Sequence, residues 1–277
     1  MISKLLVIAG TGIYPELIVR GAKAAGVSRV EVMAVKGSCS RSTARAADSS
    51  FAFAAGESDK AIEWAAKQGY DGAVLAGQVS PMSLFHGRFD ATVRGWLDHM
   101  PVKNAHSIFG KLVSEFELAG VKILPASSYM DGFLPGVGLL TERDFTDRER
   151  DDVARGMQVA LDMGRHDVGQ TVLVKSGMVL AVEAFEGTNA AIKRAGRLGK
   201  GAVLCKAARE GHDWRFDIPV VGLKTLKTMK KAGVRALAFQ AGRLILLDRE
   251  QVLEFANRHD IAIAGVESGL PNAPLRP

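Results

Sequence analysis

Apolar residues occur in two patterns along the first half of the chain. Short apolar runs with the composition of buried strands are Leu5–Gly10, Val30–Val35, Gly72–Gly77 and Val121–Leu124. Segments in which apolar residues recur with helical spacing are Ile13–Ala25, Ser58–Gln68 and Ser107–Ala119. Strands that alternate with helices in this way are typical of a parallel, doubly wound sheet. We therefore predict a Rossmann-like N-terminal domain.

Two of these helices allow a finer prediction. In Ile13–Ala25 the residues Ile13, Leu17, Gly21 and Ala24 share one stripe, which we expect to face the sheet. Ser58 precedes apolar positions at helical spacing, so we expect it to be an N-cap.

The second half of the chain has a different residue pattern. The segment Met130–Thr141 is rich in Gly and Pro and is typical of a linker. Thr146 and Glu149 have the spacing of a capping box, which predicts the start of a long helix. The residues expected on its buried face are Val153, Met157, Ala160 and Leu161.

Two hairpins are predicted after that helix. The first lies within 169–187 and turns at Ser176-Gly177, as a two-residue loop allows. Its expected cross-strand pairs are Val174 with Val179, Leu173 with Leu180 and Gln170 with Glu183. The second turns at Ala241-Gly242, with Phe239 opposite Leu244 and Arg235 opposite Asp248.

Hairpins imply antiparallel pairing, so the second half is predicted to be an α/β domain with a mixed sheet. The expected organisation is an N-terminal domain at 1–129, a linker at 130–145, a catalytic α/β domain at 146–270 and a tail at 271–277.

Composition excludes several classes of protein. The 277 residues are 47% hydrophobic and 24% charged, which is typical of a globular chain with a sizeable core. There is no run of 18 apolar residues that would span a membrane. The apolar start of the chain is short and is typical of a first strand, not of a secretory signal. Cys39 and Cys205 form no CxxC motif, so they indicate neither a zinc site nor a disulfide framework. We expect a cytoplasmic protein.

Positive charge is concentrated in one segment. Of the formal net charge of +6, Lys193–Arg235 carries +9, from twelve basic and three acidic residues, which leaves −3 for the rest. A solvated basic face, an anionic ligand and an anionic membrane surface all remain open as explanations. Nucleic acid is disfavoured, because only 6% of residues are aromatic and no RNA-binding or zinc-finger motif occurs.

Two glycine turns follow predicted strands. Gly10-Thr11-Gly12 and Ala76-Gly77-Gln78 are expected at the same rim of the sheet, where open α/β sheets bind ligands. Glycine there lets the backbone approach a phosphate, although a tight turn without a ligand is the alternative. The dinucleotide fingerprint requires a third glycine where this chain has Pro15, which disfavours a nicotinamide or flavin site.

The candidate chemistry lies in the second half. Gln170, Glu183 and Glu186 are expected at the open end of the first hairpin. There Gly187-Thr188-Asn189 begins a helix, and a helix start suits an anion. Asp217 directly precedes a short apolar strand, and carboxylates suit Mg²⁺. The alternative for each carboxylate is a solvated or capping role. The side chains that would neutralise phosphate oxygens are Lys206, Arg209, Arg215 and Lys224.

Other catalytic classes lack their motifs. The six histidines show no metal-ligand spacing, and neither G-x-S-x-G nor a P-loop occurs.

At these residues the chain resembles the two-domain UDP-2,3-diacylglucosamine pyrophosphatases of lipid A synthesis, which are unrelated to the calcineurin-like enzymes. The matching segments are DVGQTVLVKSGMVLAVEAFEGTNAAIKR, KAAR, FDIPVVG and AGRLILLDRE, with LLVIAGTGIYPELI and LAGQVSP in the first half. The match is strong from about 165 to 267 and looser before.

The resemblance implies Mg²⁺-dependent hydrolysis of UDP-2,3-diacylglucosamine to UMP and 2,3-diacylglucosamine 1-phosphate, with water attacking the sugar-side phosphorus. It implies that the substrate lies between the two domains. It also implies that Asp217, in the D-I-P motif, is catalytic. We expect Asp217 to bind the metal as well, because Mg²⁺ prefers carboxylate ligands. Substrate-binding candidates are Gly10, Thr11, Gly12, Gln78, Gln170, Glu183, Glu186, Gly187, Thr188, Asn189 and Lys206.

Two positions depart from the family pattern. Asn189 stands where the family often has Asp, and the first turn is GTG instead of GGG or GAG.

Two alternatives remain open: a non-catalytic lipid or nucleotide-sugar binding protein, and a dinucleotide-dependent oxidoreductase. The basic segment would help the protein dock at an anionic leaflet, and the sequence leaves the oligomeric state open. The interpretation depends on Asp217 converging with Glu186 and Thr188 on one cleft.

Overall fold

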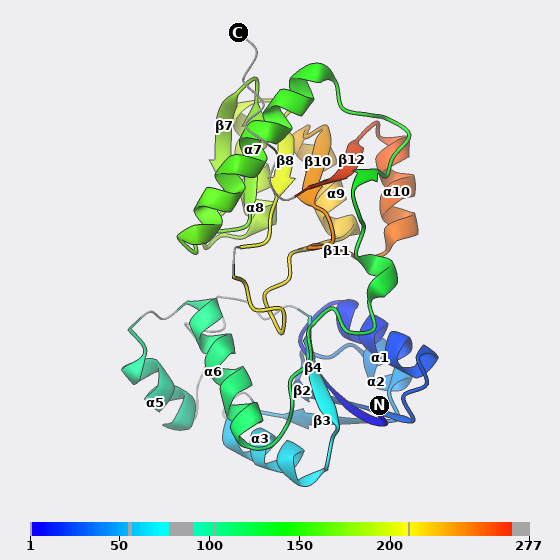
Figure 1. Ribbon diagram of the computed structural model, residues 1–277, viewed down its shortest axis with the longest axis vertical. Helices are drawn as coiled ribbons and strands as arrows, with labels where there is room; N and C mark the ends of the chain where they lie inside the picture. Colours follow the sequence, from blue (N-terminus) through cyan, green and yellow to red (C-terminus); the bar gives the residue numbers. More distant parts are fainter. Residues whose placement is uncertain (1, 55–56, 78–90, 102–103, 210, 268–277) are drawn as a thin grey trace. The chain divides into compact units, whose positions relative to one another are not determined.

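The computed structural model describes residues 2–54, 57–77, 91–101, 104–209 and 211–267 (Figure 1). Contacts divide the chain into two compact units. The first unit contains Met1–Asp131 and Asp213–Asp217, and the second contains Gly132–His212 and Ile218–Pro277. Each is an α/β unit built on its own sheet.

The first unit has a four-stranded parallel sheet in the order β3-β2-β1-β4. Its strands are β1 (Lys4–Ala9), β2 (Arg29–Val35), β3 (Ser49–Phe53) and β4 (Gly72–Ala76). Its helices are α1 (Tyr14–Ala24), α2 (Arg41–Ala46), α3 (Ser58–Lys67), α5 (Ala91–His99) and α6 (Ala105–Leu118). The predicted parallel sheet is confirmed, while β3, α2 and α5 were not anticipated. The predicted strand at Val121–Leu124 is only an isolated bridge between Ala73 and Ile123.

The prediction for the buried face of α1 was wrong. Ile13 is exposed, and the residues that α1 buries are Tyr14, Pro15, Ile18, Val19 and Ala22. The expected stripe was shifted by one residue because Tyr14 turns inward, where its hydroxyl donates to the carbonyl of Ala126. Gly21 nevertheless packs closely, since a Cβ there would lie 2.3 Å from the carbonyl oxygen of Tyr129.

Two helix starts also differ from the sequence prediction. Ser58 is the first helical residue of α3, so it is not the N-cap, which is Glu57. For α6 the cap is Asn104, whose side-chain oxygen accepts a 2.8 Å hydrogen bond from the backbone N–H of Ser107. Asn at this position satisfies an N–H that the helix itself leaves without a partner.

The second unit has a six-stranded mixed sheet in the order β5-β12-β10-β8-β6-β7. The strands are β5 (Gly138–Leu139), β6 (Thr171–Lys175), β7 (Met178–Val182), β8 (Val203–Lys206), β10 (Ala236–Gln240) and β12 (Ala262–Val266). β8, β10 and β12 are parallel to one another, whereas β5, β6 and β7 pair antiparallel with their neighbours. The predicted mixed sheet is confirmed.

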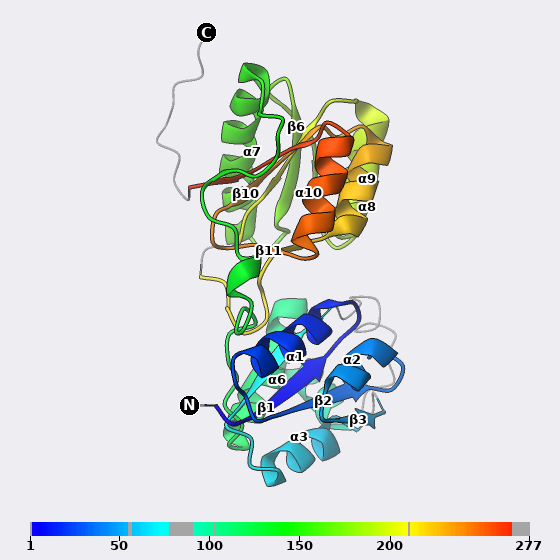
Figure 2. The same ribbon diagram turned by 90° about the vertical axis from the view of Figure 1, so that its right-hand side faces the viewer.

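Helices cover both faces of this sheet (Figure 2). On one face lies α7 (Asp147–Arg165), and on the other lie α8 (Thr188–Leu198), α9 (Leu223–Ala232) and α10 (Arg249–Arg258). The capping box of Thr146 and Glu149 at the start of α7 is present as predicted. The predicted inner face of α7 is also confirmed: Val153, Met157 and Ala160 are buried, and Leu161 packs against them.

The first predicted hairpin forms, but with a different register. Val174 pairs with Val179 as expected. A β-bulge then shifts the ladder, so that Leu173 pairs with Ala181 instead of Leu180. The backbone N–H of Glu183 consequently bonds the carbonyl of Thr171, not of Gln170. The extra residue is Leu180, which packs against the core between the sheet and α8 and α9.

The second predicted hairpin was wrong. β10 is a buried central strand between β8 and β12 and pairs in parallel with both. The chain turns after Gln240 and leaves that sheet, and β11 (Ile245–Leu246) pairs in parallel with β9 (Val220–Val221). The chain does turn at Ala241-Gly242 as predicted. However, β8 and β12 pair with the two edges of β10, so no edge is left for a hairpin partner.

None of the described helices is both long and apolar enough to cross a bilayer.

Candidate functional site

Lys206 is the centre of a buried polar cluster in the second unit. It ends β8, is only 4% exposed, and lies opposite Thr171 at the start of β6. Its Nζ donates hydrogen bonds of 3.0 Å to the hydroxyl oxygens of both Thr171 and Thr188. Three elements therefore meet at one ammonium: the end of β8, the start of β6 and the first residue of α8.

Glu183, just after β7, completes the cluster. Its Oε1 accepts a 2.9 Å hydrogen bond from the hydroxyl of Thr188. Its Oε2 lies 3.6 Å from Nζ of Lys206 and is buried without a hydrogen-bond partner. Burying an ammonium is unfavourable unless charges and hydrogen bonds compensate it, and Glu183 supplies the opposite charge. The pair thus retains a polar atom that a ligand can engage.

The start of α8 adds further polar groups. Gly187 is its N-cap, with φ of 81°, and no side chain caps the helix. The first N–H groups of a helix lack partners within the helix and carry partial positive charge. Asn189, in this first turn, has a buried Oδ1 without a hydrogen-bond partner. Most buried polar atoms have a hydrogen-bond partner within the protein, so this oxygen is available to a ligand.

Glu186 is near in sequence but faces elsewhere. Its Oε1 forms a 2.5 Å ion pair with Nη2 of Arg194 on the exposed side of α8. The hydrogen bond from Arg194 lowers the pKa of Glu186 below its usual value. The structure therefore brings Glu183, Thr188 and Lys206 into one cluster and leaves Glu186 in a separate ion pair.

The residues that follow Lys206 belong to the same end of the sheet. The carbonyl of Gln170 accepts a hydrogen bond from Ala207, and the side-chain oxygen of buried Gln240 accepts one from Ala208. Arg209 forms a 3.1 Å ion pair with Asp167. Sequence reasoning missed Thr171 and Gln240. The signal for Thr171 was its pairing with Lys206, which requires the antiparallel contact of β6 with β8.

Asp217 lies in a short segment, Asp213–Asp217, that the contacts assign to the first unit. Arg215 anchors this segment, because its guanidinium binds both the carboxylate of Asp213 and that of Glu117 on α6. The ring of Phe216 stacks on Phe109.

The backbone fixes Asp217 itself. Its N–H donates a 2.8 Å hydrogen bond to the carbonyl of Asp213. The expected convergence of Asp217 with Glu186 and Thr188, which belong to the second unit, stays a prediction.

The two glycine turns of the first unit touch each other. The N–H of Gly10 donates a 2.7 Å hydrogen bond to the carbonyl of Ala76. Gly77 has φ of +99°, and a Cβ on it would lie 2.8 Å from both the carbonyl carbon of Gly10 and the carbonyl oxygen of Thr11. Only glycine fits such an approach. Gly12, with φ of +98°, leaves open space at its Cβ position, and Gln78 lies outside the described residues.

Metal binding by these site residues depends on how their donor atoms are arranged. Within the described part of the chain, no three His, Cys, Asp or Glu side chains converge on one point. At Glu183, the ammonium of Lys206 already occupies the position that a cation would take. Magnesium is commonly held by one or two carboxylates together with substrate phosphates. A Mg²⁺ ion with Asp217 as its protein ligand stays a prediction.

Two family profiles match consecutive parts of the chain: the LpxI N-terminal domain at residues 4–133 and the LpxI C-terminal domain at residues 136–264. The chain belongs to the LpxI family. The UDP-2,3-diacylglucosamine pyrophosphatase LpxI of Caulobacter vibrioides is 29% identical over 276 residues, which cover 95% of this chain and 98% of that protein. Family membership thus extends over both units.

Two solved structures align with the chain at low scores. The biotin carboxylase subunit of a pyruvate carboxylase aligns at 13% identity with a TM-score of 0.30, over 67% of this chain and 39% of that one. N5-carboxyaminoimidazole ribonucleotide synthetase from Thermotoga maritima aligns at 15% identity with a TM-score of 0.27, over 67% of this chain and 42% of that one. Alignments at such scores support no inference about the site.

Proposed function

We propose that this protein hydrolyses the pyrophosphate bond of UDP-2,3-diacylglucosamine in lipid A biosynthesis. The observation that carries the proposal is the match of both units to the LpxI family, together with full-length similarity to an LpxI pyrophosphatase. Water adds to the sugar-side phosphorus, the anhydride bond to the uridylyl phosphate breaks, and the products are UMP and 2,3-diacylglucosamine 1-phosphate.

The Lys206 cluster fits the binding of a phosphate group. The reaction builds negative charge on phosphoryl oxygens, which fixed N–H donors and cations stabilise. Lys206 and the first N–H groups of α8 supply such donors, and Thr171 and Thr188 hold the ammonium in place. Asn189 offers Oδ1 as an acceptor for an N–H or O–H group of the substrate. The proposed substrate contacts also include Gln170 and the Gly10-Thr11-Gly12 turn.

Asp217 is proposed as the catalytic carboxylate. A carboxylate near the reacting phosphorus orients water or accepts its proton. The anchored Asp213–Asp217 segment keeps Asp217 in a defined backbone position, so the group need not be ordered for each turnover. Mg²⁺, with Asp217 as ligand, would supply positive charge that stabilises the phosphoryl oxygens.

The substrate's acyl chains determine where the reaction takes place. A lipid-linked nucleotide sugar remains in a membrane, whereas no described helix of this protein can cross one. We therefore place the protein in the cytoplasm, in reversible contact with the inner membrane.

The direct test is to incubate the purified protein with UDP-2,3-diacylglucosamine and Mg²⁺ and to separate the nucleotide products. Release of UMP with equimolar 2,3-diacylglucosamine 1-phosphate is the expected result. Solvent labelled with ¹⁸O should place the label in the sugar phosphate and not in UMP. Binding of substrate without UMP release would instead assign a carrier role.

A further inference from the structure

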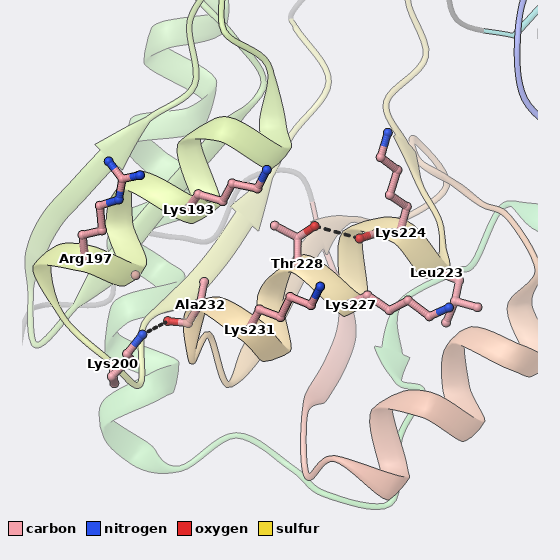
Figure 3. A pocket seen from close by; sticks show the side chains of 10 residues that line it. Lys193, Arg197, Lys200, Leu223, Lys224, Lys227, Thr228, Lys231 and Ala232 are labelled. Atoms are coloured by element: carbon pink, nitrogen blue, oxygen red, sulfur yellow. Dashed lines mark hydrogen bonds between the residues drawn. The ribbon is translucent and has the colours of Figure 1, made fainter.

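A furrow lined by six cations runs between α8 and α9 on the outside of the second unit (Figure 3). The basic side chains are Lys193, Arg197, Lys200, Lys224, Lys227 and Lys231, and all six residues are exposed. The furrow has a volume of about 720 Å³. Its floor forms where the two helices approach closely: a Cβ on Gly196 would lie 2.6 Å from the carbonyl oxygen of Ala232.

Part of this arrangement stabilises the fold, because Arg197 and Lys231 lie in last helical turns and Nζ of Lys200 donates a 3.1 Å hydrogen bond to the carbonyl of Ala232. The rest of the charge has no such role. None of the six forms an ion pair with an acidic residue in the described part of the chain. Lys193 with Arg197 and Lys227 with Lys231 are like charges four residues apart, which destabilises a helix. Lys224 lies in the first turn of α9, where a cation opposes the helix dipole. Charge kept in such positions indicates an anionic ligand.

We propose that this basic furrow docks the protein on the surface of a bilayer containing anionic phospholipids. The three lysines of α9 span eight residues, a length of about 10 Å, and Lys193 and Arg197 on α8 are followed by Lys200 just after that helix ends, so the charge is spread over an area and not focused on one point. Five of the six are lysines, which are flexible, hydrated charges suited to a diffuse anionic surface. Clusters of four to eight basic residues are typical of binding to such lipids.

Exposed apolar side chains adjoin the furrow. Leu198, next to Arg197 at the end of α8, is 65% exposed, and Met178 at the tip of the first hairpin is 64% exposed. The hairpin tip lies beside this end of α8, because Cδ of Lys175 is 3.5 Å from the Cβ position of Gly199. Basic residues with apolar neighbours are the combination that binds a membrane interface. No aromatic residue lines the furrow to stack on a nucleobase.

The test compares two double variants of the full chain by sedimentation with vesicles. Lys227→Gln with Lys231→Gln removes two charges from the furrow. Arg148→Gln with Arg155→Gln removes two exposed charges from α7, on the opposite face of the same sheet. Vesicles of phosphatidylglycerol with phosphatidylcholine are compared with vesicles of phosphatidylcholine alone, at low and high salt.

The wild type should bind the phosphatidylglycerol vesicles in a salt-sensitive manner. The furrow variant should bind roughly 25-fold more weakly, because each basic residue near an anionic leaflet contributes about a factor of five. The α7 variant should bind like the wild type. Equal binding by all three proteins, or equal loss in both variants, would overturn the proposal. Displacement of the protein from vesicles by low concentrations of inorganic pyrophosphate would assign the furrow to a soluble anion instead.

The proposal is independent of the hydrolytic activity. Hydrolysis of detergent-dispersed substrate should be the same in both variants and the wild type, since neither pair belongs to the Lys206 cluster. If the wild type bound vesicles but released no UMP, the proposed function would fail and the docking surface would stand.

Discussion

Nζ of Lys206 lies 3.0 Å from the hydroxyl oxygen of Thr188, at the first residue of α8. This contact ties the end of a central strand to a helix start that no side chain caps. It places a cation next to the partial positive charge of the helix, and among the described residues Glu183 is the acidic side chain paired with that cation. An anion is the ligand that such an arrangement favours.

Lys206→Met tests this arrangement. The substitution keeps the aliphatic stem and removes the charge, so we expect kcat/KM to fall on the order of 10²-fold, as for loss of one preorganised donor. Lys175→Met, at the end of β6, is the matched control and should leave turnover unchanged. A variant at Lys206 with normal kcat/KM and only a lower Tm would mean that the ammonium is structural.

Asp217→Ala should abolish UMP release and leave the fold intact. Loss of a group that acts in proton transfer reduces the rate by roughly 10²–10⁴-fold. Asp147→Ala, at the exposed start of α7, is the control. Circular dichroism should give wild-type spectra for both variants. Near-normal turnover by the Asp217 variant would remove this residue from the mechanism.

Glu183 and Glu186 should differ in importance, although we expect both alanine variants to weaken substrate binding or Mg²⁺ dependence. Glu183→Ala leaves Lys206 without its carboxylate and Thr188 without an acceptor, so KM should rise strongly. Glu186→Ala removes an exposed ion pair with Arg194, and such pairs contribute about 0–1 kcal/mol. Unchanged KM and Mg²⁺ titrations in both variants would assign the two residues purely structural roles.

Asp71 should make stability depend on pH in the acidic range. Hydrogen bonds from the backbone N–H groups of Lys4 and Ser3 lower the pKa of Asp71 to about 2. Because the folded-state pKa is below the ordinary value of 3.8, the stabilisation is present above that value and is lost as the pH falls towards 2.

The measurement compares Tm of the wild type and Asp71→Asn across this range. The variant should be less stable at neutral pH, and the difference should vanish near pH 2. A difference that is constant with pH would show that the charge of Asp71 contributes nothing.

Features that depend on neighbouring residues could be predicted from the sequence. The capping box of Thr146 and Glu149 starts α7 as expected, because the interaction spans only three residues. The Ser176-Gly177 turn and the pair Val174–Val179 form for the same reason. The segments around Thr188 and Asp217 also carried the resemblance to the family that both profiles confirm.

Features that depend on distant residues could not be predicted in this way. The segment after Arg235 has the turn signal of a hairpin, but its strand is buried between β8 and β12, which come from elsewhere in the chain. The bulge at Leu180 follows from packing against the core, and local pairing rules do not reveal it.

The sequence by itself determined the type of most elements, the two kinds of sheet and the family, since these follow from hydrophobic period, turn residues and local motifs. Only the tertiary structure decided that the hydroxyls of Thr171 and Thr188 both accept hydrogen bonds from the ammonium of Lys206. It also decided that Asp213–Asp217 packs with the first unit. Contacts of that kind join residues many positions apart. Their geometry is set by strand order and side-chain packing, which no local pattern encodes.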